Sequence, residues 1–384
     1  MKKEKIVLGI SGGVDSSVAA VLLQQDGYDV RGVFMKNWDD KHAICSAEDD
    51  YADALSVCKT LNISLKKIDY TAQYKDKVFK QFLDDHVHGL TPNPDVLCNK
   101  EIKFEVFQNY AKEIGATKIA TGHYADKHTT DSTCYLKKAT DQSKDQSYFL
   151  HQLGQSELKN TIFPLGKMLK KDVRSIAKKY SLINHNKKDS TGICFIGERK
   201  YNDFVGKYLT VKRGDIQSLN GEILGKHDGH IYFTIGQRKG LGIGARFSAE
   251  DKPWYVVKKD IKNNIVFVAQ GEDHPALFSE TIIVEHINWI NEKPDIFPKE
   301  YYAKVRYRDK DKLCTIFSLD NTSYLIKFKS KQKAITLGQS IVFYNKESVC
   351  IGGGIISKRD IPFLKENIDF AVPNLKKNLM QFIQ

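Results

Sequence analysis

The sequence predicts an α/β fold with a doubly wound parallel sheet, followed by a small β-rich central domain and a C-terminal antiparallel β-barrel. Apolar runs alternate with helical stripes up to about residue 122. After residue 200 the pattern changes to short strands and tight turns, and a further set of alternating strands begins near residue 273. We therefore expect domains over 1–200, 201–272 and 273–357, with 358–384 as an extension of unknown role.

Length and composition limit the classes of protein. The chain has 384 residues, too many for one compact core, with 41% hydrophobic and 28% charged residues. No apolar run approaches the ~20 residues of a membrane span. The first strand begins at Ile6, which leaves no room for a targeting peptide. We expect a cytoplasmic protein with no membrane partner.

Charge and cysteine content bear on partners. A net charge of +12 favours a polyanionic partner, although a generally lysine-rich composition explains it equally well. The seven cysteines include no Cys-x-x-Cys pair and lack histidines at zinc spacing. We expect no protein-held metal site, and each cysteine is either a small core residue or a reactive thiol.

A loop rich in glycine and serine joins the first strand to the first helix. Ile6, Val7 and Leu8 read as a buried strand, and Val18 and Val21 begin a helical stripe. Backbone N–H groups and the helix dipole would hold a phosphate there, whereas the structural alternative is a turn that only caps the helix. The loop lacks the lysine of a Walker A motif and does not fit GxGxxG. It resembles instead the SGGxDS loop of the ATP pyrophosphatases. Its residues are Gly9, Ile10, Ser11, Gly12, Gly13, Val14, Asp15 and Ser16.

The other elements of the first domain place further residues near this loop. Strands are expected over 30–35, 63–68 and 118–122, and helices over 51–61, 73–87, 102–115 and 171–180. In such a sheet, ligands bind at the carboxyl ends of the strands. Ser11, Met35 and Gly122 should therefore lie along one edge.

Two cysteines lie in unusual surroundings. Cys98 follows two prolines and falls near a helix N-terminus, where the dipole, Lys100 and Lys103 could lower the thiol pKa. Cys194 lies between small or polar residues and a basic pair. A reactive thiol and a buried core cysteine remain open for both.

The β-rich part offers three further expectations. Asn220-Gly221 predicts a hairpin turn, and Ile231 to Ile235 predicts a strand. A strand over 301–307 would place Lys304, Arg306 and Arg308 on one face. That face is either a nucleic-acid surface or an ordinary solvated face.

Together, six segments resemble the bacterial tRNA-specific 2-thiouridylase family of the ATP pyrophosphatase (PP-loop) superfamily. The resemblance extends to about residue 356, so the tail beyond Lys358 departs from the family pattern. The two cysteine segments are more specific than the loop. The segments span 9–16, 32–38, 91–104, 121–124, 190–200 and 234–244.

The resemblance implies an ATP-dependent tRNA-uridine 2-sulfurtransferase. ATP, with Mg²⁺, would adenylate the C2 oxygen of the wobble uridine U34, and a cysteine persulfide would replace that oxygen, giving 2-thiouridine, AMP and pyrophosphate. Cys194 matches the persulfide carrier, Cys98 the nucleophile that forms a transient disulfide with it, and Asp95 a candidate acid or base. The segment around Cys194 would move to bring the sulfurs together. Implied partners are tRNAs of the Lys, Glu and Gln type and a cysteine desulfurase or sulfur-relay protein.

Binding residues are also carried over from the family. The ATP site would comprise the loop residues 9–16 with Met35 and Gly122. The positions matched to tRNA or its target base are Asn93, Pro94, Asp95, His123, Lys144, Asp145, Gln146, Arg306, Tyr307 and Gln339.

Two other functions compete with this interpretation. Another ATP pyrophosphatase that amidates a small metabolite would share the loop but would need neither cysteine. A non-enzymatic RNA-binding or sulfur-relay protein would keep the loop as a relic. Release of pyrophosphate that depends on tRNA separates the three.

Overall fold

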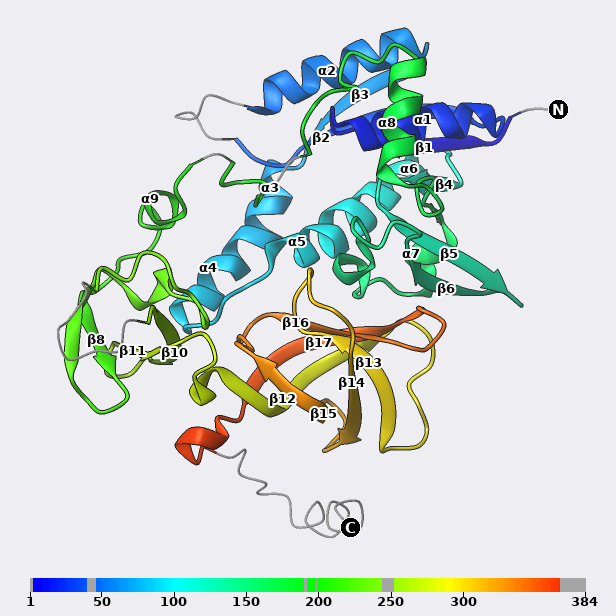
Figure 1. The fold of residues 1–384 in the computed structure, drawn as a ribbon. Helices are drawn as coiled ribbons and strands as arrows, with labels where there is room; N and C mark the ends of the chain where they lie inside the picture. The colour runs from blue at the N-terminus through cyan, green and yellow to red at the C-terminus, as the bar shows by residue number, and fades with distance from the viewer. Residues whose placement is uncertain (1–2, 40–45, 190–191, 198, 244–251, 367–384) are drawn as a thin grey trace.

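The computed structural model describes residues 3–39, 46–189, 192–197, 199–243 and 252–366 (Figure 1). Its N-terminal part is a five-stranded parallel sheet in the order β3-β2-β1-β4-β7. The strands are β1 (Lys5–Gly9), β2 (Asp29–Lys36), β3 (Ser64–Asp69), β4 (Lys118–Ala120) and β7 (Thr161–Ile162). The expected parallel α/β domain is confirmed.

Helices cover both faces of this sheet. One hydrophobic cluster includes residues of α1 (Val14–Gln25), α2 (Ser46–Thr60) and α8 (Lys170–Lys179). Figure 1 shows α8 crossing α1, and the two helices are in contact. One long helical run comprises α3 (Thr71–Tyr74), the π-helical η1 (Lys75–Phe79) and α4 (Lys80–Val87). A second comprises α5 (Pro94–Leu97), the π-helical η2 (Cys98–Val106) and α6 (Phe107–Glu113). The hairpin β5 (Ala125–Thr130) and β6 (Thr133–Lys138) is followed by η3 (Ser147–Leu150) and α7 (Gln155–Lys159).

The central part is a four-stranded sheet in the order β10-β11-β8-β9, preceded by α9 (Tyr201–Val205). Its strands are β8 (Gly214–Ser218), β9 (Ile223–His227), β10 (Trp254–Asp260) and β11 (Ile265–Gln270). The hairpin turn at Asn220-Gly221 is confirmed, since β8 and β9 pair antiparallel across it.

The strand expected over Ile231 to Ile235 is wrong. The chain forms a 3₁₀ turn, η4 (His230–Tyr232), closed by a hydrogen bond from Tyr232 N to Gly229 O. Ile231, Phe233 and Ile235 are nevertheless buried. The alternation of apolar residues therefore reflects burial of alternate side chains in the core. An irregular segment can bury its side chains in this way without pairing to a neighbouring strand.

The C-terminal part is a closed antiparallel barrel in the order β12-β15-β14-β13-β16-β17, as expected. Its strands are β12 (Phe278–Trp289), β13 (Lys299–Lys304), β14 (Lys312–Ser318), β15 (Ser323–Lys333), β16 (Ser340–Tyr344) and β17 (Cys350–Arg359). Two 3₁₀ turns, η5 (Pro275–Leu277) and η6 (Pro362–Leu364), flank it. Phe363 in η6 is exposed, and the tail residues Phe370, Leu375 and Phe382 lie outside the described residues.

The cationic face expected over 301–307 does not form. Strand β13 ends at Lys304, whose side chain is buried, and the chain then turns. The Arg306 guanidinium donates to the backbone oxygens of Ile235 and Ala334 and to Thr336 Oγ1. Only Arg308 of the three cations is exposed. Arg306 therefore joins the central part to the barrel.

The barrel also packs against the parallel-sheet domain, directly below it in Figure 1. Val342, Tyr344 and Cys350 share one apolar cluster with Val7 and Phe107. The Tyr148 hydroxyl donates to Ser340 O at 2.8 Å. The barrel thus contributes to the core behind the sheet. Among the helices of the described ranges, none combines the length and apolar character needed to cross a membrane.

Candidate active site

The loop after β1 is curled by its own hydroxyl groups. Ser16 Oγ accepts from Ser11 N at 3.2 Å and donates to Gly13 O at 3.1 Å, and Ser17 Oγ donates to Gly13 O at 2.9 Å. Within the described residues, no side chain caps α1 at its N-cap, Gly13. The free N–H groups at the positive end of the helix dipole are therefore available to an anion.

Glycines permit close contacts around this loop. A Cβ at Gly122 would lie 2.7 Å from Ser16 N, and one at Gly12, which has φ +79°, would lie 2.2 Å from Asp50 O. Neither position has space for a side chain. A Cβ at Gly9 would lie 3.1 Å from Met35 Cε. The structure therefore brings the loop, Met35 and Gly122 together at one edge of the sheet.

An ionic network lies beside the loop, and part of it was missed from the sequence. Asp15 accepts from Lys170 Nζ at 2.7 and 2.8 Å and from the Tyr124 hydroxyl at 2.9 Å. Asp189 pairs with Lys170 at 2.7 Å, with Lys144 at 2.7 Å and with Arg174 at 3.2 Å. No local pattern marks Lys170, because it lies 155 residues from Asp15 and at the start of an ordinary amphipathic helix.

The residues around the Gly9 loop fit a nucleoside triphosphate better than a metal ion held by the protein alone. Uncapped backbone N–H groups and Lys170 offer donors to phosphate oxygens. In the part of the chain that the structure describes, no three His, Cys, Asp or Glu side chains cluster as metal ligands. Both oxygens of Asp15 already bind Lys170.

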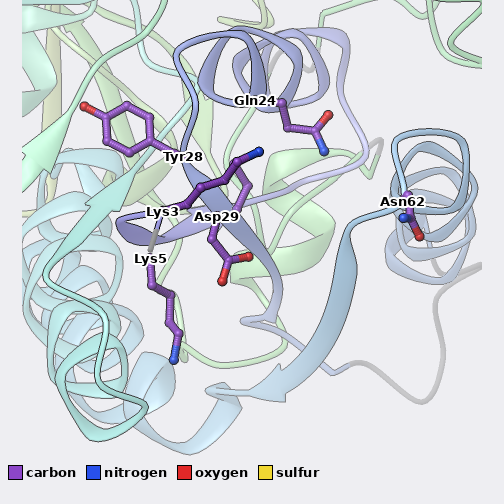
Figure 2. Close-up of a pocket in the computed structure, with 7 residues that line it drawn as sticks. Lys3, Lys5, Gln24, Tyr28, Asp29 and Asn62 are labelled. Carbon is purple, nitrogen blue, oxygen red and sulfur yellow. The ribbon is translucent and has the colours of Figure 1, made fainter. Parts of the chain in front are cut away.

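A pocket of about 380 Å³ lies elsewhere on this domain (Figure 2). It is lined by Lys5, Gln24, Tyr28, Asp29 and Asn62, among others. Lys5 and Asp29 begin β1 and β2, so the pocket lies at the amino ends of the strands. The Gly9 loop lies at the opposite edge, and we do not assign the nucleotide to this pocket.

The two candidate cysteines lie close enough for the charge of Cys194 to raise the pKa of Cys98. Cys98 is the first residue of η2 and is buried, whereas Cys194 is exposed; both are free thiols. For both cysteines, the negative charge of Asp95 raises the thiol pKa, whereas the positive charge of Lys103 lowers it. Cys194 also feels Asp50, which lies against Gly12 of the loop. The thiols and the phosphate loop therefore occupy one region.

Burial decides the ionisation of this group. Desolvation raises the pKa of Cys98 to about 12, and the charge of Lys103 offsets only part of it. The expectation that the dipole and the lysines would lower this pKa is therefore wrong for this conformation. Desolvation by the surrounding protein also raises the pKa of Cys194, although the residue is exposed, and that of the Asp95 carboxyl.

The barrel supports the loop that leads to Asp95. Gln339 Nε2 donates to Thr91 O at 2.7 Å and to Pro92 O at 3.2 Å, and Thr91 N donates to Leu337 O at 2.9 Å. Asn99 Nδ2 donates to Asp95 O at 2.9 Å. Asn93 and Pro94 lie between these contacts, so the position of Asp95 depends on the barrel.

Several positions matched to tRNA have structural partners here. His123 is buried and bonds Thr121 Oγ1 at 2.9 Å, and burial lowers its pKa well below the usual value. Asp145 is buried and accepts from Ala139 N and Ser147 Oγ. Gln146 Oε1 accepts from Tyr124 N at 2.9 Å.

Two more of these positions, Lys144 and Tyr307, also have partners within the protein. Lys144 pairs with Asp189, and the Tyr307 ring packs on Phe149 with centroids 4.5 Å apart. The segments that carry the matched positions, 121–124 and 144–146, are joined by the Gln146–Tyr124 contacts and adjoin Asp15.

The fold and the loop define a PP-loop ATP pyrophosphatase domain joined to two β-rich domains. Family models match in the same order: a tRNA methyl transferase HUP domain over 4–198, a tRNA methyl transferase PRC-barrel domain over 202–270 and an aminomethyltransferase beta-barrel domain over 279–356.

Curated relatives carry a more specific name. A tRNA-specific 2-thiouridylase MnmA from Francisella tularensis subsp. holarctica is 50% identical over 93% of this chain and 100% of its own. The MnmA of Francisella philomiragia is 51% identical over 93% and 100%. That of Pseudomonas putida GB-1 is 49% identical over 92% and 95%. The chain belongs to the tRNA-specific 2-thiouridylase family.

Proposed function

We propose that this protein catalyses the reaction for which its family is named, the replacement of the C2 oxygen of the tRNA wobble uridine by sulfur. ATP first forms an adenylate on that oxygen and releases pyrophosphate. The adenylate converts a poor leaving group into AMP. The observation that carries the proposal is the proximity of the phosphate-binding loop to the thiols: the Asp50 backbone lies against Gly12 of the loop, and the Asp50 charge acts on Cys194.

The chain's own residues have distinct tasks in the first step. The N–H groups at the start of α1 bind phosphate oxygens, and Lys170 supplies a cation beside Asp15. Met35 and Gly122 shape the site around Gly9 and Ser16. Bound Mg²⁺ would neutralise phosphate charge, and Asp15, the carboxylate beside the loop, would hold it.

The second step uses the two cysteines. Cys194, exposed, accepts a sulfur atom as a persulfide. The Cys98 thiolate attacks the Cys194 Sγ, a Cys98–Cys194 disulfide forms, and the terminal sulfur leaves with the bonding electrons. That sulfur adds to C2 of the uridine and AMP departs. Asp95, whose charge acts on Cys98, would accept the thiol proton of Cys98 when ionised, and a cellular dithiol would then reduce the disulfide.

We further propose the tRNA substrates, the sulfur donor, the domain roles and the cellular compartment by analogy with the family. The substrates are tRNAs of the Lys, Glu and Gln type, and the persulfide comes from a cysteine desulfurase or a sulfur-relay protein. Residues 1–200 form the adenylation domain, while 201–272 and 273–357 hold the tRNA. We place the reaction in the cytoplasm, where tRNA and reducing thiols are both present.

Pyrophosphate release tests this function directly. Purified protein with ATP and Mg²⁺ should release pyrophosphate only when a tRNA with uridine at the wobble position is added. The matched control is the same tRNA with cytidine there, which should give only background release. Release driven by a small amine acceptor would favour an amidating enzyme, and no release with any acceptor would favour a binding or relay protein.

A further inference from the structure

The thiol site rests on an aromatic cluster that includes Tyr74, a residue outside every matched segment. Tyr74, at the end of α3, is fully buried and shares an apolar cluster with Cys98 and Phe195. The Tyr74 ring centroid lies 6.0 Å from that of Phe195 and 6.4 Å from that of Trp38, both edge-on. Phe195 directly follows Cys194 and is itself buried. The exposed thiol is therefore covalently joined to a residue that packs on Tyr74.

Tyr74 also acts on the other thiol, with which it shares this cluster. Side-chain hydrogen bonding with Tyr74 lowers the pKa of Cys98 and raises that of Tyr74, as expected for a phenol donor, although burial shifts the Cys98 pKa further in the opposite direction. Cys194 and Asp95 are also among the charges that act on Tyr74. One side chain therefore contacts Cys98 by its hydroxyl and the neighbour of Cys194 by its ring.

We propose that Tyr74 is a positioning residue for sulfur transfer: its hydroxyl stabilises the Cys98 thiolate, and its ring fixes Phe195 and with it the approach of Cys194. This inference rests on the proposed roles of the two cysteines. The Cys98 thiolate is otherwise costly, because burial opposes its charge and Lys103 offsets only part of that cost. A phenol is a neutral donor that burial penalises less than a second cation.

The chain offers a matched control within four residues. Tyr70 is also buried, but its hydroxyl has no hydrogen-bond partner in the described structure, and the charges that act on it come from Tyr110 and Glu113. Tyr74→Phe and Tyr70→Phe therefore remove the same atom from the same region. Only the first should affect the thiols.

The test measures the pH dependence of alkylation at Cys98, read by mass spectrometry of its peptide, together with single-turnover sulfur transfer from persulfide-loaded protein. Tyr74→Phe should raise the apparent pKa of Cys98 by about one unit and slow transfer about tenfold, with tRNA and ATP affinities unchanged. Tyr70→Phe should match the wild type. Phe195→Leu should slow transfer while leaving the alkylation profile of Cys98 in place.

Clear outcomes would overturn the inference. If Tyr74→Phe leaves both the alkylation profile and the transfer rate unchanged, the hydroxyl has no role. Should Tyr74→Phe fail to fold, a ring-fluorinated tyrosine at position 74 keeps the shape and is a stronger donor. It should lower the pKa of Cys98, and no shift would count against the proposal. Alkylation needs neither tRNA nor ATP, so failure of wild-type thiolation would overturn the proposed function separately.

Discussion

Gln339 on the barrel donates a hydrogen bond of 2.7 Å to the backbone oxygen of Thr91, across 248 residues of sequence. The preceding residue, Gly338, has φ +86°, and a Cβ there would lie 2.8 Å from Leu90 Cβ. The barrel edge is therefore fitted to the loop that carries Asn93, Pro94 and Asp95. A domain assigned to tRNA binding thereby also fixes part of the chemical site.

Replacing Gln339 by alanine should impair catalysis more than stability. The substitution removes two hydrogen bonds and leaves two backbone oxygens without these donors, a loss of about 1–3 kcal/mol of loop stability. Single-turnover thiolation should fall about tenfold or more, in line with that energy. The control is Gln81→Ala, an exposed glutamine on α4, which should behave as the wild type. Equal rates for both variants would contradict a role for the barrel contact.

Lys170→Met should weaken ATP use without unfolding the domain. Lys170 bridges Asp15 and Asp189, so its loss leaves two carboxylates facing each other beside the phosphate loop. We expect nucleotide affinity to fall at least tenfold, the equivalent of about 1.4 kcal/mol, measured by calorimetric titration. Lys171→Met, at the next and exposed position of α8, is the control. Unchanged ATP affinity in Lys170→Met would refute the assignment.

Alkaline pH should destabilise the reduced protein through Cys98. The folded thiol keeps its proton up to about pH 12, against an ordinary pKa of 9.0. Above pH 9.0 the unfolded chain therefore binds fewer protons than the folded chain, and stability falls as pH rises toward the folded pKa. At about pH 10.5 the contribution lost is about 2 kcal/mol.

Denaturant titrations of wild type and Cys98→Ser across this range measure that contribution. The serine variant should lose less stability between neutral and alkaline pH, because it lacks the titrating group. Since both proteins keep the other buried thiols of the described residues, Cys58, Cys134, Cys314 and Cys350, those contributions cancel in the comparison. Parallel stability curves would show that Cys98 is not buried as a neutral thiol.

Local sequence patterns predicted most helices and strands, but they did not predict contacts between residues far apart in the sequence. The loop at Gly9 to Ser16 could be interpreted because its strand, turn and helix are contiguous. The ion pair between Lys170 and Asp15 could not be predicted, because the two residues lie 155 positions apart in the sequence and only the fold brings them together. The pKa of Cys98 was misjudged for the same reason: the neighbouring lysines are visible in sequence, whereas the burial that outweighs them comes from the packed aromatic cluster. The false strand at Ile231 to Ile235 shows that alternating burial does not establish pairing.

The most direct test of the account is sulfur transfer from loaded protein to tRNA. Wild type, Cys98→Ser, Cys194→Ser and the core control Cys58→Ala are incubated with ATP, Mg²⁺, a cysteine desulfurase and a tRNA with wobble uridine, and 2-thiouridine is measured by mass spectrometry. We expect wild type and Cys58→Ala to thiolate the tRNA. Both serine variants should fall by about a thousandfold or more, because each lacks a reacting sulfur. Full thiolation by Cys194→Ser with the same persulfide donor would contradict the two-cysteine mechanism.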